Sequence, residues 1–120
     1  MRPPLVHEEG DVLLISLDDP IAVNEGQAHG LRKLLYEPIE SRDSPKVAID
    51  LGGIDYLSST GIALVIGLKR RVEAREGRLV LFQLRPEILD LFSVMKLTTL
   101  FTILPDQEQA LDLLRSPVAD

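Results

Sequence analysis

The chain has 120 residues, of which 13 are basic and 19 are acidic, and a formal net charge of −6; this length fits a single domain over residues 1–120. The negative charge argues against nucleic acid as a partner, and the absence of cysteine excludes disulfides, thiolate metal sites and a cysteine nucleophile. No apolar run reaches the roughly 20 residues of a bilayer span and the first residues lack a signal-peptide core, so we expect a cytoplasmic domain without membrane contact.

The amino-terminal part of the sequence predicts two strands followed by a helix. Leu5–Glu8 is expected to be a short edge strand, and Val12–Leu17 is apolar enough to be covered on both faces. A helix is predicted over Glu25–Ile39, and Pro38 is expected to end or kink it. The apolar stripe of this helix is expected to be Ala28, Leu31, Leu34 and Leu35.

The middle of the chain predicts a central strand and a second helix. Val47–Leu51 is a nearly continuous apolar run, which is typical of a strand inside a parallel sheet. A helix over Thr60–Glu76 follows, with Ser58 or Ser59 as its N-cap and Gly77 as its C′ residue, the one directly after the C-cap.

The carboxyl-terminal part predicts strand, helix, strand and helix. Leu79–Phe82 and Leu100–Leu104 are the expected strands, Pro86 begins the third helix, and Asp106 caps a fourth over residues 107–115. The side chains expected to face inward are Ile88, Leu89, Leu91 and Phe92 on the third helix and Ala110, Leu111 and Leu114 on the fourth. This alternation predicts an α/β fold, a mixed β-sheet of four to five strands with about four helices packed against it.

Little in the sequence points to catalysis. The two histidines, His7 and His29, fall in a predicted strand and a predicted helix, and no spaced histidine–carboxylate group indicates a metal. Leu57–Gly61 lacks the first glycine of a G-x-S-x-G nucleophile elbow, and no phosphate-binding glycine loop is present. We therefore expect a protein that is not an enzyme and that has no cofactor and no metal.

The start of the second helix is the most informative segment, because Ser58, Ser59 and Thr60 are three consecutive hydroxyls. The amino terminus of a helix carries unpaired amides and a partial positive charge. A hydroxyl can therefore cap the helix there, and a phosphate is electrostatically favoured at the same place.

The next turns of this helix are apolar nearly all round. The inward face is predicted to be Gly61, Leu64, Val65, Leu68 and Val72. Ile62 and Ile66 fall to the side of this face, beside Ala63 and Gly67. The pattern indicates either a docking patch for another protein or a flank that neighbouring elements bury as well.

The end of the same helix is basic. The cluster consists of Lys69, Arg70, Arg71, Arg75 and Arg78, with Glu73 and Glu76 as the acidic residues among them. Positive charge complements the carboxyl end of a helix. The cluster therefore indicates either a solvated helix end or an electropositive rim that faces an acidic partner.

The order of these motifs resembles the STAS domain, the family of bacterial anti-sigma factor antagonists. Val47–Leu51 and Tyr56–Leu64 are similar to the family's strand, turn and Asp-Ser-[Ser/Thr]-Gly helix start. Downstream, Leu79–Phe82 resembles the family's next strand. Pro86–Phe92, with Leu97 after it, resembles its proline-initiated helix and the turn that follows. Asp106–Leu111 resembles its last helix. The resemblance covers about residues 5–115, the expected core of a single STAS domain, and implies the STAS fold.

The resemblance also implies control by phosphorylation. In the family, the hydroxyl after the motif Asp is phosphorylated by an anti-sigma factor that is a serine-protein kinase of the histidine-kinase-like ATPase type, and the unphosphorylated form binds that kinase and frees the sigma factor. Carried over by position, the acceptor is Ser59, with Ser58 and Thr60 as alternatives. The sequence departs from the family at Ser58, where the motif has Asp, and at Ala22, where the family often has a second acidic residue.

The resemblance places partner binding at the start and along the side of the second helix. The implied partner-binding residues are Ser58, Ser59, Thr60, Gly61, Ile62, Ala63, Ile66, Lys69 and Arg70. It leaves open a weak homodimer. The alternative functions are a non-phosphorylated interaction or scaffold domain of this fold, a module that binds a small ligand or lipid head group at the helix start, and a hydrolase using Ser59, for which no base is evident.

Overall fold

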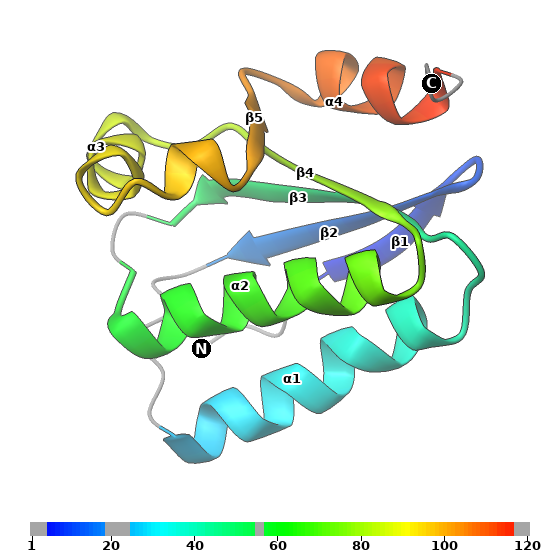
Figure 1. The fold of residues 1–120 in the computed structure, drawn as a ribbon, viewed down its shortest axis with the longest axis horizontal. Coiled ribbons are helices and arrows are strands. Elements are labelled where there is room, and N and C mark those ends of the chain that lie inside the picture. The colour runs from blue at the N-terminus through cyan, green and yellow to red at the C-terminus, as the bar shows by residue number, and fades with distance from the viewer. Residues whose placement is uncertain (1–4, 19–24, 55–56, 117–120) are drawn as a thin grey trace.

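The chain folds into a β-sheet with helices on both faces (Figure 1). The structure is a computed structural model and describes residues 5–18, 25–54 and 57–116. In chain order the elements are β1 (Leu5–Glu9), β2 (Val12–Asp18), α1 (Glu25–Glu40), β3 (Lys46–Gly53), α2 (Ser59–Ala74), β4 (Arg78–Phe82), α3 (Pro86–Val94), the 3₁₀ turn η1 (Leu97–Thr99), β5 (Thr102–Leu104) and α4 (Gln107–Arg115).

The five strands lie in the order β1-β2-β3-β4-β5. β1 is an edge strand antiparallel to β2, and the other neighbouring pairs are parallel. The predicted mixed sheet is therefore confirmed, as is the edge position of the first strand. Because β2, β3 and β4 are parallel, their carboxyl ends meet at one end of the sheet, and the segments that follow β3 and β4 leave from that end.

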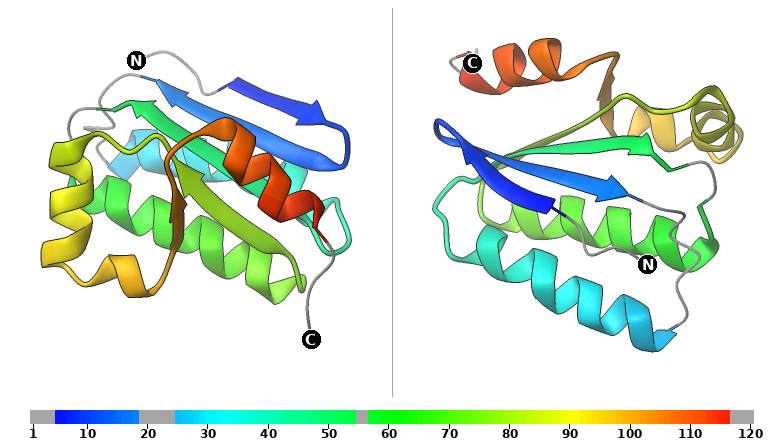
Figure 2. Two further views of the ribbon diagram at one scale, coloured as in Figure 1. Left: turned by 90° about the horizontal axis from the view of Figure 1, so that it is seen from above. Right: turned by 180° about the vertical axis from the view of Figure 1, so that it is seen from behind.

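The helices form two layers around the sheet. α1 and α2 lie side by side on one face, and α4 crosses the other (Figures 1 and 2). Side chains alternate along a strand, so Val47 and Ile49 of β3 belong to the core on the α1–α2 side while Ala48 packs beneath α4. All three are completely buried, which confirms that the central strands are covered on both faces.

Helix α1 departs from its predicted stripe. Leu35 is fully buried, but Leu34 is 48% exposed and faces away from the core; the side chains of Ala28 and Leu31 lie outside the described residues. Pro38 lies inside the last turn, and α1 continues to Glu40. A proline in the last turn removes only one helical hydrogen bond, so the helix can end two residues after it.

α2 ends at Ala74, two residues before the predicted Glu76, and its C′ residue lies one position earlier than predicted. Arg75 is the C-cap, and Glu76 rather than Gly77 is the C′ residue with positive φ, at 59°. Gly77 follows it, and its N–H donates to the Val72 carbonyl at 2.9 Å, as in a Schellman motif. The glycine is required for space, because a Cβ there would lie 2.2 Å from the Pro45 carbonyl oxygen.

Helix α3 begins at Pro86 as predicted, but it buries fewer side chains. Ile88 and Phe92 are buried and Leu91 is half-buried, whereas Leu89 is 41% exposed, so its predicted inward position is wrong. A nine-residue helix presents only about one face to the core, and Leu89 falls beside that face. The predicted strand Leu100–Leu104 is shortened to β5, because the N–H groups of Leu100 and Phe101 donate to the Leu97 carbonyl and so belong to the end of the turn η1.

We expect Gly77→Ala to lower the free energy of unfolding by about 1–3 kcal/mol, because the new methyl group meets backbone that cannot move freely. Gly30→Ala is the matched control, since it sits within α1 and, apart from its chain neighbours and the backbone of its own helix, no atom of the described residues lies within 4 Å of the place that its new Cβ would take. That change should raise stability by about 0.5–1 kcal/mol. Urea unfolding measures both values, and equal effects at the two glycines would contradict the close approach at Pro45.

Candidate functional site

The segment after β3 brings the hydroxyl cluster to the carboxyl end of the sheet. Near the end of β3, the Asp50 carboxylate accepts a hydrogen bond from the Gly52 N–H at 2.8 Å. The Ile54 N–H then donates to the Leu51 carbonyl at 3.1 Å. Ile54 and Leu57 are both buried, and they anchor the two ends of the connection from which α2 starts.

Ser58 and Ser59 have different structural roles. Ser58 is the N-cap of α2: its backbone is extended, and its hydroxyl accepts a hydrogen bond from the Gly61 N–H at 3.1 Å. Ser59 is the first residue of the helix and is exposed, while Ser58 and Thr60 are half-buried. The prediction of an N-cap at Ser58 or Ser59 is therefore resolved in favour of Ser58, and Ser59 is the hydroxyl that a partner can reach.

The predicted inward face of α2 is confirmed, but part of the expected docking patch beside it is buried. The buried residues of this helix are Gly61, Ile62, Leu64, Val65, Leu68 and Val72. Ile62 is only 7% exposed and belongs to the core, so its side chain is not available as a docking surface. Ile66 is half-buried against the same core, and Ala63 is exposed.

What remains accessible on α2 is a narrow line of side chains, which we call the outer stripe: Ser59, Ala63, Ile66 and Arg70. At about 100° per residue these four positions fall within an arc of about 60°, opposite the centre of the buried face. Ser59, Ala63 and Arg70 are exposed and Ile66 is half-buried. The stripe thus combines a hydroxyl, a small apolar patch and a cation.

Most of the basic cluster is engaged within the chain on the α1 side and along α2. The Lys69 ammonium lies 2.7 Å from the Glu73 carboxylate. The Arg71 guanidinium lies 3.2 Å from Glu40 of α1 and 4.6 Å from the centre of the Tyr36 ring. The Arg71 contacts tie α2 to α1, and both ion pairs reduce the charge that Lys69 and Arg71 present to another molecule.

The remaining arginines differ from one another. Arg75 donates to the Arg42 carbonyl at 2.6 Å and lies 3.4 Å from the Asp43 carboxylate. Arg78 donates to the carbonyls of Leu113 and Ser116, at 2.8 and 3.1 Å, and so holds the end of α4. Arg70 is exposed and makes no ion pair with any residue in the described part of the chain.

The described residues hold no group of three or more His, Cys, Asp or Glu that could bind a metal ion. His7 is exposed on β1, with its Nε2 3.4 Å from Glu9, and the side chain of His29 and all of Ala22 lie outside the described residues. Among the described helices, none is long and apolar enough to cross a membrane.

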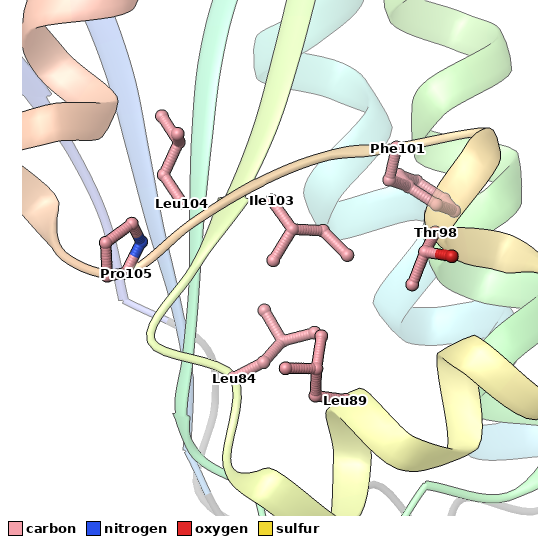
Figure 3. A pocket seen from close by; sticks show the side chains of 7 residues that line it. All are labelled: Leu84, Leu89, Thr98, Phe101, Ile103, Leu104 and Pro105. Atoms are coloured by element: carbon pink, nitrogen blue, oxygen red, sulfur yellow. The ribbon is translucent and has the colours of Figure 1, made fainter.

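The structure also contains a groove that the sequence did not predict. It has a volume of about 660 Å³ and lies between α3 and β5 (Figure 3), lined by Leu84, Leu89, Thr98, Phe101, Ile103, Leu104 and Pro105. The sequence did contain one indication of this groove. Four apolar residues were predicted to face inward on α3, and one face of so short a helix cannot bury all four.

Comparison with known proteins identifies the fold. The STAS domain family model matches residues 3–110. A protein of Bordetella bronchiseptica described as an anti-sigma factor antagonist, BtrV, is 28% identical over 88 residues, which are 73% of this chain and 75% of that protein.

Solved structures agree with this assignment. An anti-sigma-factor antagonist (STAS) domain protein from Planctomyces limnophilus has a TM-score of 0.82 at 20% identity, over 94% of this chain and 98% of that one. SpoIIAA, an anti-sigma factor antagonist, has a TM-score of 0.77 in its unphosphorylated form at 20% identity, over 97% of this chain and 99% of that one. The phosphorylated form of Bacillus SpoIIAA has a TM-score of 0.69 at 19% identity, over 93% and 99% of the two chains. The fold is therefore the STAS fold.

We expect Ser58→Ala to lower the free energy of unfolding by about 1 kcal/mol, because it removes the side-chain oxygen that accepts the Gly61 N–H. Ser58→Asp should keep most of the stability, since aspartate caps helices as well as serine does. Ser59→Ala, at the exposed neighbouring position, should change stability by less than about 0.5 kcal/mol. Chemical denaturation compares the three variants, and an equal loss at both serines would show that the capping role is shared.

Proposed function

The chain belongs to the STAS domain family, and from that premise we propose that it is an anti-sigma factor antagonist. In this proposal it is a cytoplasmic single-domain module that binds an anti-sigma factor of the serine-kinase, histidine-kinase-like ATPase type through the outer stripe. Phosphorylation of Ser59 by that partner ends binding. The likeness to BtrV and to both forms of SpoIIAA supports the proposal.

The observation that carries the proposal is the division of roles between Ser58 and Ser59. The Ser58 hydroxyl accepts the Gly61 N–H and caps α2, while the Ser59 hydroxyl is exposed at the first helical position. Phosphorylation of Ser59 therefore leaves the cap in place. It also puts negative charge at the amino end of a helix, where the macrodipole and the first amides favour an anion.

The modified domain should consequently keep its fold and change only its surface. A phosphoserine adds about −1.5 to −2 charges, and Ala63 lies one turn further along the outer stripe, with Ile66 beyond it. A partner that packs apolar side chains on these residues would have to bring them next to a strongly hydrated dianion. The cost of desolvating that group opposes docking, which makes phosphorylation an off switch for binding.

We propose no catalytic role for the chain itself. Within the described residues, no hydrogen bond or ion pair joins the Ser59 hydroxyl to a histidine, lysine or carboxylate that could act as a base. In the proposed reaction the kinase supplies the nucleotide and the catalytic groups, and this chain supplies the acceptor hydroxyl.

A second candidate function is an interaction or scaffold domain that is not phosphorylated. The residue that favours it is Ser58, which stands where the family motif has Asp, so the carboxylate beside the acceptor hydroxyl is missing. In that case the outer stripe still docks a partner, but Ser59 serves only as a contact residue.

Phosphorylation separates the two candidates. After incubation with ATP and each serine-kinase anti-sigma factor of the same genome, we expect one added phosphate by intact mass spectrometry. Ser59→Ala should abolish the gain because it removes the exposed acceptor, while Ser58→Asp and Thr60→Val should retain it. No gain with any of these kinases at saturating concentration would favour the scaffold function.

Docking is tested independently of phosphorylation. We expect Ala63→Arg to weaken binding of the same kinase at least tenfold, because a long charged side chain replaces the smallest contact of the outer stripe. Stability should change little, since arginine is a good helix former at an exposed position. Gln109→Arg adds the same charge on α4, on the other face of the sheet, and should bind normally in calorimetry. Normal binding by Ala63→Arg would place the docking surface elsewhere.

A further inference from the structure

We infer that the partner presents a carboxylate to Arg70. The partner segment that binds the outer stripe is therefore apolar, with an acidic side chain at one end. This inference rests on the proposed function, because it describes the chemistry of the surface that binds the same stripe. It assigns Arg70 as the anchoring charge of the interface and Ser59 as the site where binding is switched.

The first argument is the charge balance of the basic cluster. Lys69, Arg71 and Arg75 each have an acidic partner within the chain, at 2.7, 3.2 and 3.4 Å respectively. The guanidinium of Arg78 is occupied by carbonyls at the end of α4. Arg70 is exposed and, in the part of the chain that the structure describes, has no ion-pair partner. It is the cation of this cluster that remains available to another molecule.

The second argument is the direction in which Arg70 points. It lies 11 residues after Ser59 on the same side of α2, about 16 Å along the helix axis at 1.5 Å per residue. Ala63 and Ile66 lie between them on the same line. A partner segment that covers the apolar middle of the stripe therefore reaches Arg70 without leaving the line that contains Ser59.

The third argument selects a carboxylate as the group that Arg70 binds. The planar guanidinium donates two parallel hydrogen bonds to a carboxylate or a phosphate. A polyanion such as nucleic acid is disfavoured, because the whole chain carries a net charge of −6 and would repel it. A single carboxylate beside apolar side chains matches both the isolated cation and the half-buried Ile66 next to it.

The separation between the two ends of the stripe has a functional consequence. A distance of about 16 Å is twice the Debye length of about 8 Å at physiological ionic strength. Arg70 therefore cannot neutralise a phosphate on Ser59, and the two groups act on the partner independently. Changes at both positions should add, as they do for sites more than 7–10 Å apart that contact different groups of the partner.

The test uses the full chain and the purified serine-kinase anti-sigma factors of the same genome. We expect Arg70→Glu to weaken binding about 100-fold in calorimetry, and Arg70→Lys about fivefold, because lysine keeps the charge but loses the paired hydrogen bonds. Arg115→Glu is the matched control: it makes the same change of charge at an exposed position on α4, and binding should stay within threefold of wild type. Circular dichroism checks that each variant is folded.

Charge reversal identifies the partner group. Substituting the exposed carboxylates of the kinase one at a time by arginine should yield one variant that restores binding to Arg70→Glu and weakens binding to the wild-type chain. In addition, the effects of Ser59→Asp and Arg70→Glu should sum in the double variant.

The outcomes separate the inference from the proposed function. If Arg70→Glu binds within threefold of wild type while Ala63→Arg loses binding, the carboxylate contact is refuted and the docking function stands. Equal weakening by Arg70→Glu and Arg115→Glu would also refute it, because it would show an effect of net charge alone. If neither Ala63→Arg nor Arg70→Glu changes the affinity, or if no kinase binds the wild-type chain, both proposals fall.

Discussion

The rotation of α2 about its own axis is the constraint on which the rest of the site depends. Gly61, Leu64, Val65, Leu68 and Val72 fix that rotation because all of them are buried. Once the inward face is set, the outward face follows from the helical repeat. Ser59 and Arg70, though 11 residues apart, must then point in the same direction, and no loop has to be ordered to bring them into line.

The cap at Ser58 makes this surface compatible with covalent change. If one hydroxyl had to both cap α2 and accept a phosphate, modification would remove a hydrogen bond from the Gly61 N–H and weaken the start of the helix. With Ser58 as the cap and Ser59 as the exposed residue, the two tasks fall on neighbouring side chains. The proposed phosphorylation of Ser59 would therefore act on a partner while the domain keeps its fold.

Much of this arrangement could be predicted from the sequence, because it depends on local patterns. The inward face of α2, the N-cap among the first hydroxyls, the proline at the start of α3 and the mixed sheet all follow from periodicity and capping rules. Long-range packing could not be read in the same way. Ile62 lies off the inward face, yet neighbouring elements bury it, and Leu89 and Leu34 are left exposed. The sequence also could not show which arginine of the basic cluster has no ion-pair partner among the described residues. These pairings depend on long-range contacts, since the partner of Arg71 is 31 residues away in α1.

The distribution of charge along α2 determines how strongly the proposed phosphate on Ser59 would act on a partner. From Ser58 to Leu68 the sequence contains no charged side chain, and the cations begin only at Lys69. A lysine or arginine within one turn of Ser59 would pair with a phosphate and lessen its effect on whatever docks beside it. Along α2 the nearest favourable charge is the helix terminus itself, a partial charge of about one half. It stabilises the phosphate but does not neutralise its negative charge. In the proposed function, the apolar first turns of α2 therefore have two roles: they offer contact area when Ser59 is unmodified, and they leave a phosphate on Ser59 uncompensated.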